Sequence, residues 1–554
     1  MENKAIAKIF KRYSQLMELF NENPFRTKAM ASASFKIDKL PIPAAQASLE
    51  ELSAQPGIGK STAERMLSVI ENGSFPELDA LLEKTPKGIL DMLNIKGLGP
   101  KKIQIIWKEL EIESIGELLY ACNENRLIEA KGFGLKTQEE IRKSIEFLQD
   151  HQGLLLYAKA EQAAETLLQQ IQQAFPTDQH TFTGDFRRKC EVLATVDLLS
   201  SCPLQELQTL LLEHNYRLVR LEEQVLELED ELGIHYRIFA SDPSTFAYNL
   251  LLLTGSEAHL EQLRASCGEI PVLASEEAIY AALGLAYIAP ELREGDQEIS
   301  WAKANKLPEL IQYSDLKGTL HNHSTYSDGV HSLEQMARYA KEELGLDYLG
   351  ICDHSKTAVY ARGLPIERVY EQWAEIDKLN TELAPFRIFK GIESDILADG
   401  SLDYPDEILA KFDFVVASVH SNLRMDEAKA TSRLLKAIEN PYTSILGHPT
   451  GRLLLSRPGY PIDYKKVIDA CAANRVVIEI NANPLRLDLD WRWQRYALEK
   501  GVLLSINPDA HRMEGLRDMH YGVQVARKGG LSAENCLNAF SLETISRYFK
   551  KRQL

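Results

Sequence analysis

Nine histidine and carboxylate side chains follow short apolar runs in the part of the chain from Lys317 onward. These runs end in GTLHNHSTYSDG, YLGICDHS, FRIFKGIES, FDFVVASVHSN, TSILGHPTG and VLLSINPDAH, and a further run, VVIEINANP, ends in Asn481 and Asn483. The carboxyl ends of the strands of a parallel α/β barrel converge on one face, where active sites are built. We therefore expect the nine side chains to meet there: His321, His323, Asp328, His354, Glu393, His420, His448, Asp509 and His511.

The types of these residues suit metal ions of borderline hardness. Imidazole and carboxylate together bind zinc, manganese or iron. His321 and His323 are two residues apart on an extended segment, so both rings point to one side, and Asp509 and His511 share this spacing. Nine donors are too many for one ion and fit two or three ions that share a bridging carboxylate. Such clustered cations bind a phosphate and bring the pKa of a bridging water toward neutrality, which makes a hydroxide nucleophile.

A structural origin for these histidines is the alternative. A lone buried histidine is usually a hydrogen-bonded core residue. Six of the 13 histidines of the chain, however, follow the apolar runs, two of them in an HxH pair and one in a DxH pair. This concentration at strand ends favours a metal site.

The bulk composition describes a multidomain globular protein. A chain of 554 residues predicts about three to five domains. No apolar run is long enough to cross a bilayer, and the start MENKAIAKIFKRYSQ lacks the apolar stretch of a secretory signal. The seven cysteines are dispersed and form no CxxC pair, which argues against a disulfide framework or a zinc ribbon. We expect a cytoplasmic protein that does not associate with membranes.

Three related glycine turns interrupt the amphipathic helical pattern of residues 1–150. They are PGIGKS, IKGLGPKK and AKGFGLKT. A GxG turn lets backbone N–H groups at a helix N-terminus approach a phosphate closely, and lysines after the turns add charge. Such contacts hold the DNA backbone without reading sequence. The candidate DNA-binding residues are Gly57, Gly59, Lys60, Gly97, Gly99, Lys101, Lys102, Gly132, Gly134 and Lys136.

The distribution of charge is compatible with that interpretation. The chain carries a net charge of −17, but residues 1–150 contain 21 Lys and Arg against 22 Asp and Glu. The acidity therefore lies mainly outside residues 1–150. A neutral domain can hold DNA through a few local contacts, although it has no strong electrostatic footprint.

The order of elements predicts different folds along the chain. Residues 153–240 mix helices with strand-like runs such as EVLATVDLLSS and IHYRIFAS. From Lys317 on, apolar strands alternate with helical segments, which is typical of a parallel α/β sheet or barrel.

The motifs HNHS, SDG, CDHS, GIES, SVHSN, GHPTGR and NPDAH resemble those of the polymerase and histidinol phosphatase (PHP) superfamily. The resemblance implies a distorted seven-stranded (β/α) barrel with a trinuclear metal centre. If the ligands of the family are assigned to the matching motif positions of this chain, three ions would be held. The first would be bound by His321, His323, Glu393 and Asp509, the second by Glu393, His420 and His448, and the third by Asp328, His354 and His511.

The same resemblance suggests catalytic roles for Glu393, Asp509 and His511. Arg452, also expected to be catalytic, and Arg486 are candidates to meet the substrate phosphate, and an exposed structural arginine is the alternative for each. Asp353 is a candidate to orient a ligand histidine through a hydrogen bond to the ring nitrogen that does not bind the metal.

Upstream, the glycine turns resemble helix-hairpin-helix motifs, and residues 1–312 resemble the body of a bacterial family X DNA polymerase. The stretches that carry this likeness are GDFRRKCEVLATVDLL, LLLTGSEAHLEQLR and AIYAALGLAYIAPELREGDQEI. The implied fold is multidomain, α+β and α/β. Its expected domains are 1–82 (helical, helix-hairpin-helix), 83–152 (fingers-like, helix-hairpin-helix), 153–245 (palm-like nucleotidyltransferase), 246–312 (thumb-like) and 313–554 (PHP barrel).

The palm motif departs from the family pattern GSxRRxxExxxDxD followed by DxR. The family's three aspartates hold two magnesium ions around the primer end and the triphosphate. Here those positions hold Thr195, Asp197 and His235, Asp185 replaces the serine, and Arg188 is retained. Threonine and histidine cannot replace carboxylates around Mg²⁺. We therefore expect no magnesium at the palm and no DNA synthesis.

A second departure concerns deoxyribose-phosphate lyase activity. Family members with this activity form a Schiff base through a lysine on the helix after the first hairpin, where this chain has Arg65. A guanidinium stays protonated and cannot form the imine. Lyase activity is therefore in doubt, with Lys60 as a poor substitute.

Together these observations predict a DNA-binding, metal-dependent 3′-to-5′ exonuclease or phosphoesterase of DNA repair. Its polymerase-like residues 1–312 would bind DNA ends for the barrel but not synthesise DNA. A monomer is the simplest expectation. Three alternatives remain: a small-molecule phosphatase of the histidinol-phosphate type, a DNA-binding scaffold without activity, and an active family X polymerase. The hairpins argue against the first, the complete donor set against the second, and Thr195 and His235 against the third.

Overall fold

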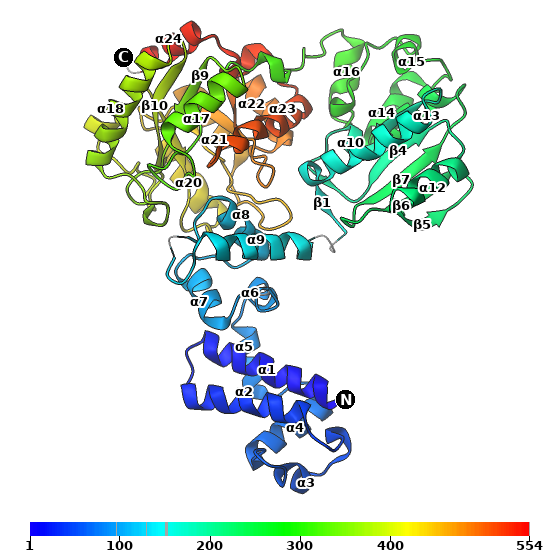
Figure 1. Ribbon diagram of the computed structural model, residues 1–554. Helices are drawn as coiled ribbons and strands as arrows, with labels where there is room; N and C mark the ends of the chain where they lie inside the picture. The colour runs from blue at the N-terminus through cyan, green and yellow to red at the C-terminus, as the bar shows by residue number, and fades with distance from the viewer. Residues whose placement is uncertain (96, 129, 150–152, 553–554) are drawn as a thin grey trace. The chain divides into compact units, whose positions relative to one another are not determined.

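The computed structural model describes residues 1–95, 97–128, 130–149 and 153–552. The chain forms two compact units, Met1–Glu146 and Phe147–Leu554, and each is described by itself (Figure 1). The predicted boundary at residue 152 and Lys96 of the second glycine turn lie outside the described residues. The finer division into five domains stays a prediction.

The first unit is helical. Two long antiparallel helices lead into a series of short ones that end with a longer helix. Their bounds are α1 (Asn3–Leu19), α2 (Pro24–Asp38), η1 (Ala44–Gln46), α3 (Leu49–Ser53), α4 (Lys60–Asn72), α5 (Pro76–Glu83), α6 (Lys87–Met92), α7 (Pro100–Lys108), α8 (Ile115–Asn123) and α9 (Leu135–Gln149). Aromatic side chains fill the core under α1, where the Phe75 ring lies 5.7 Å from Phe10 and 4.9 Å from Tyr13.

The three glycine turns share one backbone geometry. The first glycine of each turn has positive φ: 78° at Gly57, 90° at Gly97 and 88° at Gly132. The next residue donates its N–H to a carbonyl three residues earlier, and in the first two turns its side chain is buried. The second glycine precedes α4, α7 and α9 in turn. Because the repeat extends to backbone hydrogen bonds, the turns are three copies of one helix-hairpin-helix element.

The second unit begins with a five-stranded sheet. Its strand order is β2-β4-β7-β6-β5, and β4 and β7 run parallel. The bounds are β2 (His180–Thr183), β4 (Val196–Ser200), β5 (Arg217–Leu221), β6 (Val225–Glu229) and β7 (His235–Ala240), with β1 (Leu155–Leu156) pairing β3 (Val192–Leu193) and with α10 (Tyr157–Ala174), α11 (Gly184–Arg187) and α12 (Leu204–Glu213). The predicted strand-like runs are thus β4 and β7.

A helical segment follows this sheet. It contains α13 (Phe246–Thr254), α14 (Glu257–Cys267), α15 (Glu276–Ala282), η2 (Pro290–Leu292) and α16 (Glu298–Lys303). Its core surrounds Tyr280 and the fully buried Arg293, whose guanidinium donates to Glu276 at 2.5 Å.

The rest of the unit is a nearly closed parallel barrel. Seven strands follow one another in chain order, and each neighbouring pair is parallel. They are β8 (Gly318–Thr319), β9 (Tyr348–Ile351), β10 (Arg387–Asp395), β11 (Phe414–Ser418), β12 (Ile445–Leu446), β13 (Val477–Asn481) and β14 (Leu504–Asn507).

Helices cover the barrel from outside (Figure 1). They are α17 (Leu333–Arg338) with its π-helical continuation η4 (Tyr339–Glu343), α18 (Ile366–Glu382), α19 (Asp406–Leu409), α20 (Glu427–Ile438), α21 (Tyr464–Asn474), α22 (Trp491–Glu499), α23 (Met519–Lys528) and α24 (Leu542–Arg552). Single turns complete the connections: η3 (Tyr313–Asp315), η5 (Val359–Ala361), η6 (Met513–Asp518), η7 (Ala533–Asn535) and η8 (Leu537–Ala539). The predicted fold class is confirmed.

An apolar plug fills the barrel below the strand ends that carry the polar residues. Phe549 of α24 packs on Phe389 and Phe414, with ring centroids 5.4 and 5.1 Å apart. Cys352 lies buried between this plug and the polar end, and its thiol donates to the Leu320 carbonyl at 3.0 Å. The plug closes one end of the barrel and leaves the other for chemistry.

Side chains close the seam between β14 and β8, where no strand ladder forms. Asn507 accepts a hydrogen bond from the Leu320 N–H at 3.0 Å. Asn538 donates to the Gly318 carbonyl at 3.1 Å and to the Ile506 carbonyl at 2.8 Å, and it accepts from the Ile506 N–H at 2.7 Å. One fully buried amide thereby supplies bonds that a continuous ladder would make between these strands, and just beyond them the His323 N–H donates to the Ala510 carbonyl at 2.9 Å.

The substitution Asn538→Ala is expected to destabilise the barrel by about 2–4 kcal/mol, because it leaves buried backbone groups of both edge strands without partners. Urea unfolding followed by tryptophan fluorescence measures this loss. Asn535→Ala is the matched control, since the Asn535 side chain donates to the nearby Ser532 hydroxyl at 3.0 Å, and it should change stability by less than about 0.5 kcal/mol. Equal midpoints for the two variants would contradict the role of Asn538.

No helix in the described part of the chain combines the length and apolar character needed to span a membrane.

Candidate metal centre

The structure brings the nine candidate ligands together at the carboxyl ends of the barrel strands. His321 and His323 follow β8, His354 follows β9 and Glu393 lies near the end of β10. His420, His448 and the Asp509–His511 pair follow β11, β12 and β14, and Asp328 comes from the loop after β8. The nine are linked through nitrogen–oxygen distances of 4 Å or less, as detailed below, so the expected convergence occurs.

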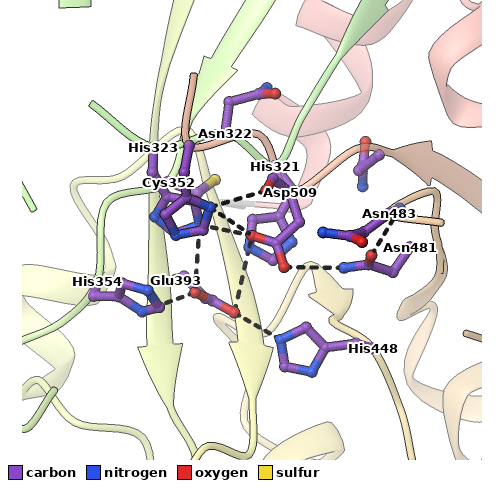
Figure 2. Close-up of polar contacts among 12 residues, drawn as sticks. His321, Asn322, His323, Cys352, His354, Glu393, His448, Asn481, Asn483 and Asp509 are labelled. Atoms are coloured by element: carbon purple, nitrogen blue, oxygen red, sulfur yellow. Dashed lines mark hydrogen bonds and ion pairs between the residues drawn. The ribbon is translucent and has the colours of Figure 1, made fainter. Parts of the chain in front are cut away.

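Glu393 lies at the centre of the cluster (Figure 2). Its Oε1 is 3.1 Å from Nε2 of His420, 3.1 Å from Nε2 of His448 and 3.3 Å from Nε2 of His321. Its Oε2 is 2.9 Å from Nδ1 of His354. A single carboxylate therefore faces four imidazoles from four strands, which is the position of a bridging ligand.

Two further carboxylates complete the cluster. Asp509 Oδ1 is 3.0 Å from Nε2 of His323. Asp328 is 3.3 Å from Nε2 of His511 and 3.5 Å from Nε2 of His354. The cluster thus alternates carboxylate and imidazole groups from one side of the barrel to the other.

Buried ring nitrogens without good hydrogen bonds show that the donor set fits cations. His321 Nε2, His323 Nδ1, His448 Nδ1 and both ring nitrogens of His354 are buried and make no hydrogen bond of acceptable geometry. Three of these nitrogens, His321 Nε2 and both of His354, lie within 2.9–3.5 Å of carboxylate oxygens of Glu393 or Asp328. Buried polar groups are normally satisfied, so divalent cations are the species that these residues suit.

The ligand atoms gather into three groups that a metal ion could bind. They are His323, Asp328, His354 and His511; His321, His323 and Glu393; and His354, Glu393 and His420, with all ligand atoms of a group within 4.8 Å of one another. Glu393 belongs to two groups. The grouping implied by resemblance differs in detail, because here His323 also joins Asp328, and His354 also joins His420.

Two carboxylates behind the cluster orient its histidines, and neither was expected from the sequence. Glu479 of β13 accepts from Nδ1 of His321 at 2.7 Å, and it also accepts from the His448 backbone N–H at 2.8 Å. Asp395 at the end of β10 lies 2.5 Å from Nδ1 of His420. Such partners fix the ring orientation and the tautomer of a metal-binding histidine. An acidic residue inside the apolar run VVIEI was the available signal for Glu479.

The electrostatics of the cluster keep its carboxylates ionised. Burial alone would raise the pKa of the Glu393 carboxyl, yet the charges of His420 and His321 outweigh it and hold that pKa well below its ordinary value. Asp328 and Asp509 likewise have lowered pKa values because of neighbouring histidines.

His323 carries the opposite shift. Burial, together with the neighbouring His511 and His354, lowers its pKa to about 3. The imidazole is therefore neutral near pH 7, which is the form that binds a metal ion.

Two candidate ligands have left-handed backbone. φ is 24° at His448 and 54° at Asp509. Non-glycine residues rarely adopt this region, and such positions concentrate at functional sites where the surrounding structure enforces them.

Asp353 does not orient a histidine, contrary to the sequence-based hypothesis. It accepts hydrogen bonds from the backbone and hydroxyl groups of Ser324 and Ser327, and from the Gln372 amide. Its position after β9 turns it toward the loop that carries Asp328. It therefore shapes that loop, whereas Glu479 and Asp395 hold the histidines.

The Arg452 guanidinium is hydrogen-bonded to other groups of the protein. Its guanidinium donates to the carbonyls of Arg486 and Leu487 and to the carboxylate of Asp490. These bonds brace two loops of the rim and argue against the predicted role for Arg452 at the substrate phosphate. Arg486 lies closer to the cluster, with Nε 4.0 Å from Asp509 Oδ2.

The palm-like sheet has a different organisation. The β4–β7 register pairs Asp197 with Arg237, whose guanidinium donates to both Asp197 oxygens at 2.8 and 2.6 Å. The Thr195 hydroxyl donates to Asp197 at 2.8 Å. His235 faces Glu227 at 3.4 Å. Asp197, the one carboxylate kept among the three metal-binding positions of the family motif, is therefore paired within the protein.

The arginine next to this sheet is also paired. Arg188 contacts Asp185, donates to Glu294 at 3.1 Å and donates to the Thr254 carbonyl at 2.7 Å. Lys528, a fully buried residue of α23, reaches the same Glu294 and donates to the Arg188 carbonyl at 2.9 Å. Arg188 is thus held between Asp185 and Glu294 within the protein.

The candidate DNA-binding glycines of the first unit lie at the surface. A Cβ added at Gly59, Gly97, Gly99, Gly132 or Gly134 would meet no atom within 4 Å. At Gly59 and Gly99, φ is −82° and −91°, which any residue adopts. Neither internal packing nor backbone conformation therefore requires glycine at these two positions. Lys60, Lys101 and Lys136 are exposed beside the turns.

Arg65, at the position of the lyase lysine, has structural partners. Its guanidinium donates to Glu77 at 2.7 Å and to the Ser61 hydroxyl at 2.7 Å.

Comparison with known proteins agrees with these features. The barrel with its ring of histidines and carboxylates defines a PHP domain, and the family model described as PHP domain matches residues 319–483. Models described as helix-hairpin-helix domain and SAM-like helix-hairpin-helix tandem match residues 1–75 and 89–146. The chain is 33% identical, over the whole length of both proteins, to the DNA polymerase/3′-5′ exonuclease PolX of Bacillus subtilis (strain 168). It belongs to the bacterial PolX family with a C-terminal PHP domain.

Shorter relatives match the barrel alone. A probable phosphatase of Thermoanaerobacter sp. (strain X514) is 28% identical over 42% of this chain and 94% of its own. A probable phosphatase of Acetivibrio thermocellus is 26% identical over 42% of this chain and 95% of its own.

The substitution Glu479→Gln is expected to weaken divalent-metal binding at the barrel about 10–100-fold, because a neutral amide orients and polarises His321 less well than a carboxylate. Calorimetric titration of Mn²⁺ and Zn²⁺ into the chelator-treated protein measures this change. Glu499→Gln, at an exposed position of α22, is the control with the same chemical change. Equal affinities in the two variants would show that Glu479 does not support the site.

Proposed function

We propose that this protein is a metal-dependent DNA 3′-to-5′ exonuclease or phosphoesterase that acts in DNA repair. The observation that carries the proposal is the convergence of nine nitrogen and oxygen donors around Glu393 at one barrel mouth. Two or three divalent ions, manganese, zinc or iron, suit these donors, which offer imidazole and carboxylate but no thiolate.

The candidate ligands have different proposed positions around those ions. Glu393 is the proposed bridge, because both of its oxygens face imidazoles. Asp509 and His511 follow the last strand and face His323 and Asp328. Bound divalent ions would supply Lewis acidity at the scissile phosphate and lower the pKa of a water that attacks it.

Residues outside the ligand set orient the reactants. Glu479 and Asp395 keep the rings of His321 and His420 turned toward Glu393. Arg486 is the proposed contact for the negative charge that develops on the phosphate, since its guanidinium lies beside Asp509 and only 4% of the residue is exposed. Fixed charges of this kind stabilise the transition state without reorganising.

The first unit is proposed to hold the DNA backbone. Three exposed GxG turns at helix N-termini, with lysines beside them, suit phosphate groups. The relative from Bacillus subtilis is named for both polymerase and exonuclease activity, and its match covers the whole length of both proteins.

DNA synthesis is proposed to be absent. Asp197 is paired with Arg237, and Thr195 and His235 add no carboxylate to hold magnesium. Asp185 and Glu294 occupy Arg188. The palm-like domain would then have a structural role beside the barrel and no catalytic one.

The nuclease is tested with 3′-labelled single-stranded DNA and Mn²⁺. The unaltered protein should release mononucleotides, and His323→Ala and Asp509→Ala should lower the rate at least about 100-fold, because each removes a donor from the centre. His214→Ala serves as the control, since His214 lies on the surface of the palm-like sheet region. Rapid turnover of small phosphomonoesters with intact DNA would instead favour the phosphatase that the shorter relatives suggest.

The palm is tested by primer extension with all four nucleotides and either Mg²⁺ or Mn²⁺. No product is expected, in the unaltered protein or in the Asp509→Ala variant, where nuclease activity cannot remove added nucleotides. Extension by the nuclease-deficient variant would overturn the proposal for the palm.

A further inference from the structure

One loop at the mouth of the barrel carries an exposed valine between two exposed cations. It comprises residues 355–364, directly after the candidate ligand His354, and we call it the β9 loop because it follows that strand. Val359, near its centre, is 80% exposed. Lys356 and Arg362 are exposed as well, and the sequence of the loop, SKTAVYARGL, contains no acidic residue. The β9 loop therefore presents positive charge and one apolar side chain next to the candidate metal centre.

Backbone hydrogen bonds tie both ends of the β9 loop to candidate ligands. The Ser355 N–H donates to the Glu393 carbonyl at 3.0 Å, and the Leu364 N–H donates to the His354 carbonyl at 2.8 Å. Gly363 lies against Ser355, whose carbonyl oxygen would be only 1.9 Å from an added Cβ. The loop is therefore closed tightly at its base, beside two residues of the cluster.

Side-chain contacts hold the middle of the loop. The Thr357 hydroxyl lies 2.8 Å from the Asp395 carboxylate and 2.9 Å from that of Asp403, and the Thr357 N–H donates to Asp403 at 2.7 Å. The Tyr360 ring stands edge-on to the His354 ring, with centroids 6.2 Å apart. Because Asp395 also orients a ligand histidine, the groups that build the centre fix the position of the loop as well.

The place of Val359 matters more than its exposure, because single apolar side chains are common on protein surfaces. Two other aliphatic side chains are exposed on loops at the same end of the barrel: Val330, after β8, is 49% exposed, and Leu455, after β12, is 45% exposed. The Val330 N–H donates to the carbonyl of the candidate ligand His511 at 2.8 Å. The rim around a site suited to phosphate thus also offers aliphatic contacts.

Resting on the proposed phosphoesterase function, we propose that Val359 packs against the base of the nucleotide whose phosphodiester is cleaved. Lys356 and Arg362 attract the phosphates of the adjoining nucleotides, as cations do along a nucleic-acid backbone. A nucleobase has a flat face that an aliphatic side chain can cover, whereas a simple phosphate ester leaves the valine in water. The β9 loop thereby selects nucleotides over small phosphate esters at the same centre.

The base contact is tested with two p-nitrophenyl esters, the full chain and Mn²⁺. Thymidine 5′-p-nitrophenyl phosphate carries a base, and methyl p-nitrophenyl phosphate has the same leaving group without one. Val359→Ser should lower the ratio of their kcat/KM values about fivefold or more, because serine offers less apolar surface to the base. Val359→Ile should keep the wild-type ratio. Val272→Ser, the same change at a half-exposed valine between α14 and α15, is the control and should also keep it.

The cations are tested with Lys356→Gln/Arg362→Asn on 3′-labelled oligothymidylate. Asparagine suits position 362, where φ is 55°. The slope of log kcat/KM against log salt should become shallower by about 1.4, since each cation on a single strand contributes about 0.7. Lys303→Gln/Lys306→Gln removes the same charge from exposed positions at the end of α16 and should keep the slope. An unchanged slope in the loop variant would overturn the role of the two cations.

An unchanged ester ratio in Val359→Ser would overturn the base contact. An equal loss on both esters would overturn it too, because it would show that the residue only supports the shape of the loop. Calorimetric titration of thymidine 5′-monophosphate with Mn²⁺ present reads the contact without turnover, and Val359→Ser should weaken this binding about fivefold. If the unaltered chain hydrolyses neither ester, the proposed function fails, and the titration alone decides the base contact, which equal affinities would reject.

Discussion

A carboxylate buried inside a parallel barrel is the constraint on which the functional end of this protein depends. Glu393 is 1% exposed and faces imidazoles from four strands. A buried charge costs several kcal/mol unless opposite charges and hydrogen bonds compensate it. The surrounding histidines supply that compensation, and they in turn need acidic partners on their far sides. Glu479 and Asp395 provide them. Carboxylate, imidazole and a second set of carboxylates therefore follow one another outward from Glu393.

The barrel separates this polar cluster from an apolar interior. Phe549 of the last helix packs on Phe389 and Phe414 at one end, and the ligands gather at the other. The barrel must also hold its strand ends at fixed positions although β8 and β14 do not pair. Asn538 makes that connection with a buried amide. Rigid packing below and hydrogen bonding along the seam thus hold ligands from different strands within reach of the same ions.

The two candidate metal-binding regions of the second unit differ in how their polar groups are satisfied. In the barrel, His354 keeps both ring nitrogens buried without good hydrogen bonds, so the donors face one another. In the palm-like sheet, Asp197 is saturated by Arg237, and Arg188 is held by internal carboxylates. Lys528 of the barrel domain joins that second network from its buried position. Internal ion pairs thus satisfy the charged groups of this sheet, and Lys528 connects the sheet to the barrel.

The sequence by itself determined the features that depend on local spacing. Apolar runs followed by histidine or aspartate predicted both the barrel and its nine candidate ligands, because strand ends converge in that fold. The GxG spacing predicted the turns, because the first glycine must take positive φ. Tertiary structure alone decided which groups stand behind the ligands. Glu479 serves His321 across strands 158 residues apart, whereas Asp353, next to a ligand in sequence, holds a loop instead. Such roles follow from which strands become neighbours, and no local pattern encodes that.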